Sequence, residues 1–86
     1  MTKNVLLILL NHRKDCAITV QKLLTTWGCI IKTRLGLHEG VLQNCSETGF
    51  MFLELVGEED KHEELTRKMN LVAGVTAKLV SLDIDE

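Results

Sequence analysis

The sequence predicts an α+β domain in which two helices cover one face of a four-stranded antiparallel sheet. Three observations lead to this prediction. Apolar and polar residues alternate along residues 29–37 and again along residues 48–56, as expected for strands that bury one face. The uninterrupted apolar run over residues 5–10 is typical of a strand that is covered on both faces. Two segments with apolar residues at helical spacing separate these strands.

The first strand is predicted over residues 3–10, in the middle of the sheet because both of its faces are apolar. A polar turn over residues 11–15 leads into the first helix, whose apolar stripe consists of Val20, Leu23, Leu24 and Trp27. Gly28 follows this stripe, at the position where a glycine commonly ends a helix.

The middle of the chain is predicted to form a β-hairpin with a long polar loop. Residues 29–37 form its first strand and residues 48–56 its second. Strict alternation from residue 29 onward places Leu35 on the face that the helices cover. The same alternation places Lys32 and Arg34 on the opposite face.

The second helix begins near an acidic segment, and its apolar stripe contains Leu65, Met69 and Val72. A last strand is predicted over residues 75–82. The element order is therefore β-α-β-β-α-β. With right-handed crossovers this order gives a ferredoxin-like sandwich with sheet order 4-1-3-2 and both helices on one face.

Two layers leave one face of the sheet without helices. Besides half of the first strand, this face is predicted to carry Lys32, Arg34, Phe50, Phe52 and Glu54. The two phenylalanines are too apolar to face water, so we expect a second copy of the chain to cover them. Glu54 opposite Lys32 or Arg34 would fix the register of that interface. The sequence therefore predicts a homo-oligomer, either a dimer or a tetramer.

Composition argues against several classes of function. The formal net charge of -2 leaves no basic patch, so direct binding to nucleic acid is not expected. The longest apolar run is far shorter than the ~20 residues that cross a membrane. Three cysteines without paired spacing favour reduced thiols and a cytoplasmic location. We also expect no catalysis, because no nucleophile with its base and no Gly-rich phosphate loop is visible.

Several segments resemble a known family. They are Arg34-Leu35-Gly36, Phe52-Leu53-Glu54-Leu55, residues 65–69 and residues 72–78. Together with the hairpin, they are similar to the iron-only hydrogenase system regulators, which are small proteins with an ACT-like, ferredoxin-like fold. The resemblance implies that residues 1–86 form one ACT-like regulatory domain. It also implies a cytoplasmic, oligomeric regulatory protein of anaerobic metabolism that senses a ligand.

The resemblance to ACT-like proteins implies a site for a small-molecule effector. ACT domains bind amino acids at the turn after the first strand, at a junction between subunits. The corresponding pocket would be lined by Asn11 and His12 and by the partner's backbone at Leu35, Gly36 and Leu37. A structural interaction module without a small ligand is the alternative to such a sensor.

A second resemblance concerns the hairpin loop and the metal-binding domain of nickel-responsive repressors. Asn44-Cys45-Ser46-Glu47 is similar to the Asn-Cys-x-Glu motif of those proteins, although their His-x-His pair is missing. The alternative function is therefore a transition-metal-binding module. His38 and Cys45, with His12 or Cys16 from a neighbouring subunit, would supply imidazole and thiolate to Ni, Cu or Zn.

The remaining cysteines have different expected roles. Cys16, near the start of the first helix, is the better candidate for a reactive thiol, because a helix N-terminus favours the thiolate. Cys29 is expected to be a small core residue.

Overall fold

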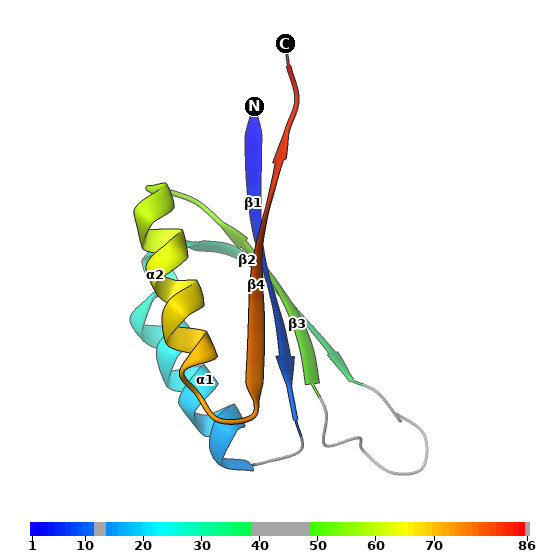
Figure 1. Cartoon of the computed structure of the whole chain (residues 1–86), viewed down its shortest axis with the longest axis vertical. Coiled ribbons are helices and arrows are strands. Elements are labelled where there is room, and N and C mark those ends of the chain that lie inside the picture. Colours follow the sequence, from blue (N-terminus) through cyan, green and yellow to red (C-terminus); the bar gives the residue numbers. More distant parts are fainter. Residues whose placement is uncertain (12–13, 39–48, 86) are drawn as a thin grey trace.

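The helices and strands follow one another in the predicted order (Figure 1). The computed structural model describes residues 1–11, 14–38 and 49–85, and only the backbone of residues 14, 15, 37 and 38. The elements are β1 (Thr2–Leu10), α1 (Lys14–Thr26), the 3₁₀ turn η1 (Gly28–Ile30), β2 (Ile31–His38), β3 (Gly49–Leu55), α2 (Glu59–Asn70) and β4 (Val75–Asp83).

The four strands form one antiparallel sheet with the order β2-β3-β1-β4. This is the predicted ferredoxin-like order, and it places the doubly apolar β1 between β3 and β4. The sheet therefore has β2 and β4 as its edge strands. Neither α1 nor α2, the helices of the described residues, is long and apolar enough to cross a membrane.

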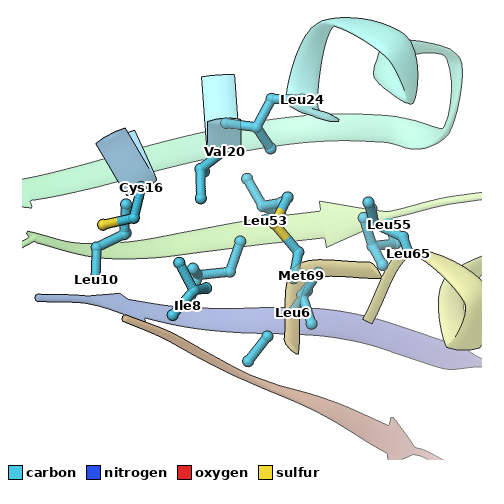
Figure 2. Close-up of a cluster of buried hydrophobic side chains, with 12 residues drawn as sticks. Leu6, Ile8, Leu10, Cys16, Val20, Leu24, Leu53, Leu55, Leu65 and Met69 are labelled. Carbon is cyan, nitrogen blue, oxygen red and sulfur yellow. The ribbon is translucent and has the colours of Figure 1, made fainter. Parts of the chain in front are cut away.

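Both helices lie on the same side of the sheet (Figure 1), and their buried side chains pack in one cluster with those of the sheet. Figure 2 shows α1 and α2 contributing side chains that meet those of β1 and β3. Leu6, Ile8 and Leu53 of the sheet are fully buried, as are Leu65 and Met69 of α2. Burying each of these side chains contributes roughly 1.5–3 kcal/mol, which makes this cluster the main source of stability.

β2 departs from the alternation that its sequence suggests. Ile31 pairs with Leu55 while Thr33 pairs with Glu54, so the intervening lysine is an extra residue in a β-bulge. A shift of one residue moves every later side chain of the strand to the other face. Leu35 therefore lies opposite Phe52, on the face away from the helices, and its predicted placement under the helices is wrong.

The same bulge reverses the position of Arg34. Its side chain lies on the helix side of the sheet, where its Nη2 atom donates a hydrogen bond to Oε1 of Gln21 in α1. The prediction that Arg34 faces away from the helices is therefore wrong. The lysine at the bulge itself, Lys32, does reach the open side, where it approaches Glu54.

Two glycines require the left-handed region of backbone conformation, and Gly28 is not one of them. Gly57 has φ of 89° and Gly74 has φ of 84°. Instead of ending at a left-handed glycine, α1 runs through Trp27 into η1. Gly74 also accepts a hydrogen bond at its carbonyl from the Asn11 backbone amide, 2.8 Å away, which joins the end of β1 to the start of β4.

β1 and β4 pair along their whole length, from Thr2 opposite Asp83 to Leu10 opposite Val75. The pairing continues one step further, because the Ile84 amide donates to the Met1 carbonyl at 2.9 Å. As a result, the two ends of the chain lie side by side and extend beyond the helices (Figure 1).

Candidate functional site

The side of the sheet opposite the helices, called the open face below, is largely apolar. The strand registers place on it Val5, Leu7, Leu9, Leu35, Phe50, Phe52, Val80 and Leu82. Leu9, Leu35 and Leu82 are 47%, 52% and 63% exposed. Both described helices lie on the other side, so no described segment shields these side chains.

Phe50 and Phe52 of β3 form the centre of the open face, the face on which they were predicted to lie. Their ring centroids are 4.8 Å apart and the rings are tilted by 58°. Leu7 pairs with Phe52 from β1, and Leu35 pairs with Phe52 from β2. The result is a continuous apolar surface that crosses three strands. Large contiguous apolar surfaces of this kind mark interaction sites.

A charged cluster around Glu54 borders this apolar surface. Lys3 Nζ lies 3.1 Å from Oε2 of Glu54, Lys32 Nζ lies 4.0 Å from the same oxygen, and the Thr33 hydroxyl donates to Oε1 at 3.5 Å. The hydrogen bond from Lys3, together with the positive charge of both lysines, lowers the pKa of the Glu54 carboxyl. The sequence predicted the partner Lys32 but missed Lys3.

A hollow of about 480 Å³, called the Gly36 hollow below, opens between α1 and the sheet on the other side. The helix side of β2 and β3 carries two glycines at this end, Gly36 and Gly49. A Cβ atom added at Gly36 would have no heavy atom of the described residues within 4 Å. The hollow therefore occupies the space that a side chain at position 36 would fill. Its walls include Leu10, Ala17, Val20, Gln21, Arg34 and Met51.

Arg34 brings a positive charge to this hollow. It is held by the neutral amide of Gln21 at 2.7 Å, and no carboxylate of the described residues forms an ion pair with it. The guanidinium of Arg67, by contrast, is 2.6 Å from Glu64 on α2. The sequence did not predict this hollow. The bulge turns Arg34 toward the helices, but apolar and polar residues still alternate along β2, so the sequence pattern does not reveal the bulge.

The residues of the predicted effector pocket lie in different surroundings. Asn11 borders a hollow of about 330 Å³ between the end of β1 and the start of β4. Leu35, Gly36 and Leu37, whose backbone was predicted to line the partner's side of the pocket, belong to the edge strand β2. His12 and the side chain of Leu37 lie outside the described residues. The pocket between subunits remains a prediction.

The predicted metal ligands lie largely outside the described part of the chain. This applies to His12, to Cys45 and to the side chain of His38. Among the residues that are described, no group of three or more His, Cys, Asp or Glu side chains could hold a metal ion.

Of the two described cysteines, Cys16 is buried and Cys29 is exposed. Cys16 is only 2% exposed, and its Sγ donates to the Asn11 carbonyl at 3.6 Å. Figure 2 shows it in line with Val20 and Leu24 on the buried side of α1. This burial argues against the predictions of Cys16 as a reactive thiol and as a ligand from a neighbouring subunit. Cys29 lies in η1 and is exposed instead of forming part of the core.

His62 is a buried polar residue that sequence reasoning missed. It is 1% exposed, and the Nε2 atom lies 2.8 Å from the Val56 carbonyl, so the proton on that nitrogen is donated to the carbonyl. Within the described structure its Nδ1 atom is buried without a hydrogen-bond partner. Its position three residues before Leu65 continues the apolar stripe of α2, and this spacing was the available signal. The contact joins α2 to the end of β3.

Comparison with known proteins supports the fold. No protein-family model matches the sequence, and no curated protein matches it. An uncharacterized protein from Thermotoga maritima has a similar structure, with a TM-score of 0.81 and 25% identity over 96% of this chain and 100% of that chain. CPII from Thiomonas intermedia, a nitrogen regulatory PII-like protein bound to ADP, AMP and bicarbonate, gives a TM-score of 0.60. Its identity is 12% over 100% of this chain and 96% of that chain.

Proposed function

We propose that this chain is a self-associating regulatory module that senses a small ligand and catalyses no reaction. The open face is the observation that carries this proposal. Leu9, Leu35 and Leu82 are about half exposed or more, beside two phenylalanines whose rings are tilted against each other. Each Å² of apolar surface that a second copy removes from water contributes roughly 25 cal/mol. Self-association through this face is therefore strongly favoured.

The regulatory part of the proposal has two supports. CPII, which has the same fold, is described as a regulatory protein bound to ADP, AMP and bicarbonate. The sequence also resembles the iron-only hydrogenase system regulators, so we propose that the regulated process involves such a hydrogenase. Hydrogenase activity in cells that lack this chain, compared with cells in which it is restored, tests that assignment. Unchanged activity would contradict it.

Sedimentation analysis tests the self-association. The wild-type chain is expected to form a dimer or tetramer at micromolar concentration. Leu9→Lys places a charge on the open face and is expected to yield monomers, because an unpaired buried charge strongly opposes association. Leu71→Lys is the matched control, because Leu71 is 70% exposed and follows α2, away from the open face.

The expected pattern is an assembled wild type, an assembled Leu71→Lys variant and a monomeric Leu9→Lys variant with an unchanged circular dichroism spectrum. A wild type that stays monomeric across this concentration range would contradict the proposal. So would a Leu9→Lys variant that assembles as well as the control, since the interface would then lie elsewhere.

A further inference from the structure

We infer that the Gly36 hollow binds a small organic carboxylate, with Arg34 holding the carboxylate group and the apolar walls holding the rest of the molecule. The inference names a ligand class for the proposed regulatory module, and it rests on that proposal for the ligand's regulatory role. Binding itself depends only on the described residues of α1, β1, β2 and β3.

Space is the first argument. Gly36 and Gly49 remove two side chains from the floor of the hollow, and Ala17 of α1 places a small residue above them. Within the described part of the chain, a Cβ at Gly36 would touch nothing, and one at Gly49 would only reach ordinary contact with Leu10, at 3.8 Å. The volume of about 480 Å³ lies within the ~300–1,000 Å³ range of small-molecule sites.

Charge is the second argument. The Arg34 guanidinium forms a planar fork of donors, and the described structure pairs it with a neutral amide instead of a carboxylate. Lys3 and Lys32, in contrast, share Glu54, and Arg67 has Glu64. An arginine fork matches the two oxygens of a carboxylate with two parallel hydrogen bonds. The side-chain amide of Gln21 lies beside this fork and fixes its orientation.

The walls decide between a carboxylate and a phosphate. Leu10, Val20 and Met51 are apolar and offer no donors to the further oxygens of a dianionic phosphate. A carboxylate group needs only the guanidinium of Arg34, and the apolar remainder of the ligand can lie against these three side chains. A monoanion with a short apolar tail is therefore the ligand class that the hollow fits.

Titration with sodium hexanoate tests the inference, with backbone amide chemical shifts as the readout and ionic strength held constant with sodium chloride. We expect saturable shifts that are largest at Gly36, Gly49 and Ala17. Arg34→Gln should weaken the affinity by about tenfold, as expected when a charge-assisted hydrogen bond is lost. Arg67→Gln is the matched control and should leave the affinity unchanged, because Arg67 lies on α2 and pairs with Glu64.

A second variant and two further probes make the test sharper. Gly36→Leu fills the hollow and should abolish the shifts, while hexanol, which lacks the charge, should bind at least about tenfold more weakly than hexanoate. Sodium sulfate should not compete with hexanoate. Non-saturating or scattered shifts, full affinity in Arg34→Gln, or competition by sulfate would each overturn the inference. Because these shifts report on the hollow in any assembly state, they are independent of the sedimentation result.

Discussion

Two glycine-to-alanine substitutions should change stability in opposite directions. Gly36 lies inside β2 without a positive φ, and a Cβ there would meet no heavy atom of residues 1–11, 14–38 and 49–85, as far as these are described, within 4 Å. Gly36→Ala should therefore stabilise the chain by roughly 0.5–1 kcal/mol, because alanine loses less backbone freedom on folding. Gly74 has φ of 84°, and a Cβ there would lie 2.6 Å from Oδ1 of Asn11.

The penalty at Gly74 has two parts. The left-handed conformation costs an alanine about 1–2 kcal/mol. The added methyl group must also displace the Asn11 side chain, which lies beside Sγ of Cys16. We therefore expect Gly74→Ala to destabilise the chain by at least ~2 kcal/mol.

Urea and thermal unfolding at one fixed protein concentration measure both effects, since self-association makes the midpoint depend on concentration. A change of 1 kcal/mol shifts the melting temperature of a domain of this size by about 4–8 °C. Gly36→Ala should therefore raise it by about 2–8 °C, and Gly74→Ala should lower it by at least ~8 °C. A Gly36→Ala variant that is less stable than wild type would show that the space above Gly36 is filled. The carboxylate site would then lose its first argument.

Substitutions at two further positions test the polar contacts. Because the folded-state pKa of Glu54 is lowered, its contribution to stability is present above the unfolded-state pKa and is lost as the pH falls through the folded-state pKa. Glu54→Gln should therefore lose less stability on acidification than wild type in urea unfolding across a pH series, and an identical acid dependence would refute this. The Asn70 side chain bonds both the amide and the carbonyl of Ala77, at 2.8 and 2.9 Å. Asn70→Ala should cost about 2 kcal/mol in thermal unfolding. Asn70→Asp keeps the acceptor for the Ala77 amide but sets a carboxylate oxygen against the Ala77 carbonyl, so it should also be less stable than wild type; equal stability of all three chains would count against the contact.

The strand order could be predicted because one strand differs from the others. β1 is apolar on both faces and was expected to lie centrally, and the ferredoxin-like order with right-handed crossovers places it there. The apolar character of the open face also followed from alternation, since Phe50 and Phe52 share a face in any register. The central position of β1 and the apolar open face can both be predicted from the spacing of apolar residues along single strands. Neither requires knowing which residue of one strand pairs with which residue of the next.

The candidate site was harder to predict because it depends on that pairing. Ile31, Thr33 and Leu35 alternate without interruption, so nothing local to β2 marks Lys32 as an extra residue. Only the pairing with β3 reveals the bulge, and the bulge turns Arg34 toward the Gly36 hollow.

The cysteines could have been placed better from the sequence. Cys16, Val20 and Leu24 follow one another at intervals of four residues, which puts Cys16 on the buried stripe of α1. Cys29 has no such periodicity, because it lies in the 3₁₀ turn that follows the helix. For Cys16 the four-residue spacing indicated burial. The prediction of a reactive thiol relied instead on its position near the start of α1.

The full-length pairing of β1 with β4 has a consequence for the chain during translation. When a ribosome has released β1, both helices and the hairpin, the side of β1 that will pair with β4 still exposes its backbone donors and acceptors. An unpaired apolar edge of this kind readily recruits a strand from another nascent chain. Only synthesis of residues 75–83 protects that edge. Correct assembly therefore depends on how promptly β4 reaches β1, a closure between residues as far apart in the sequence as Thr2 and Asp83.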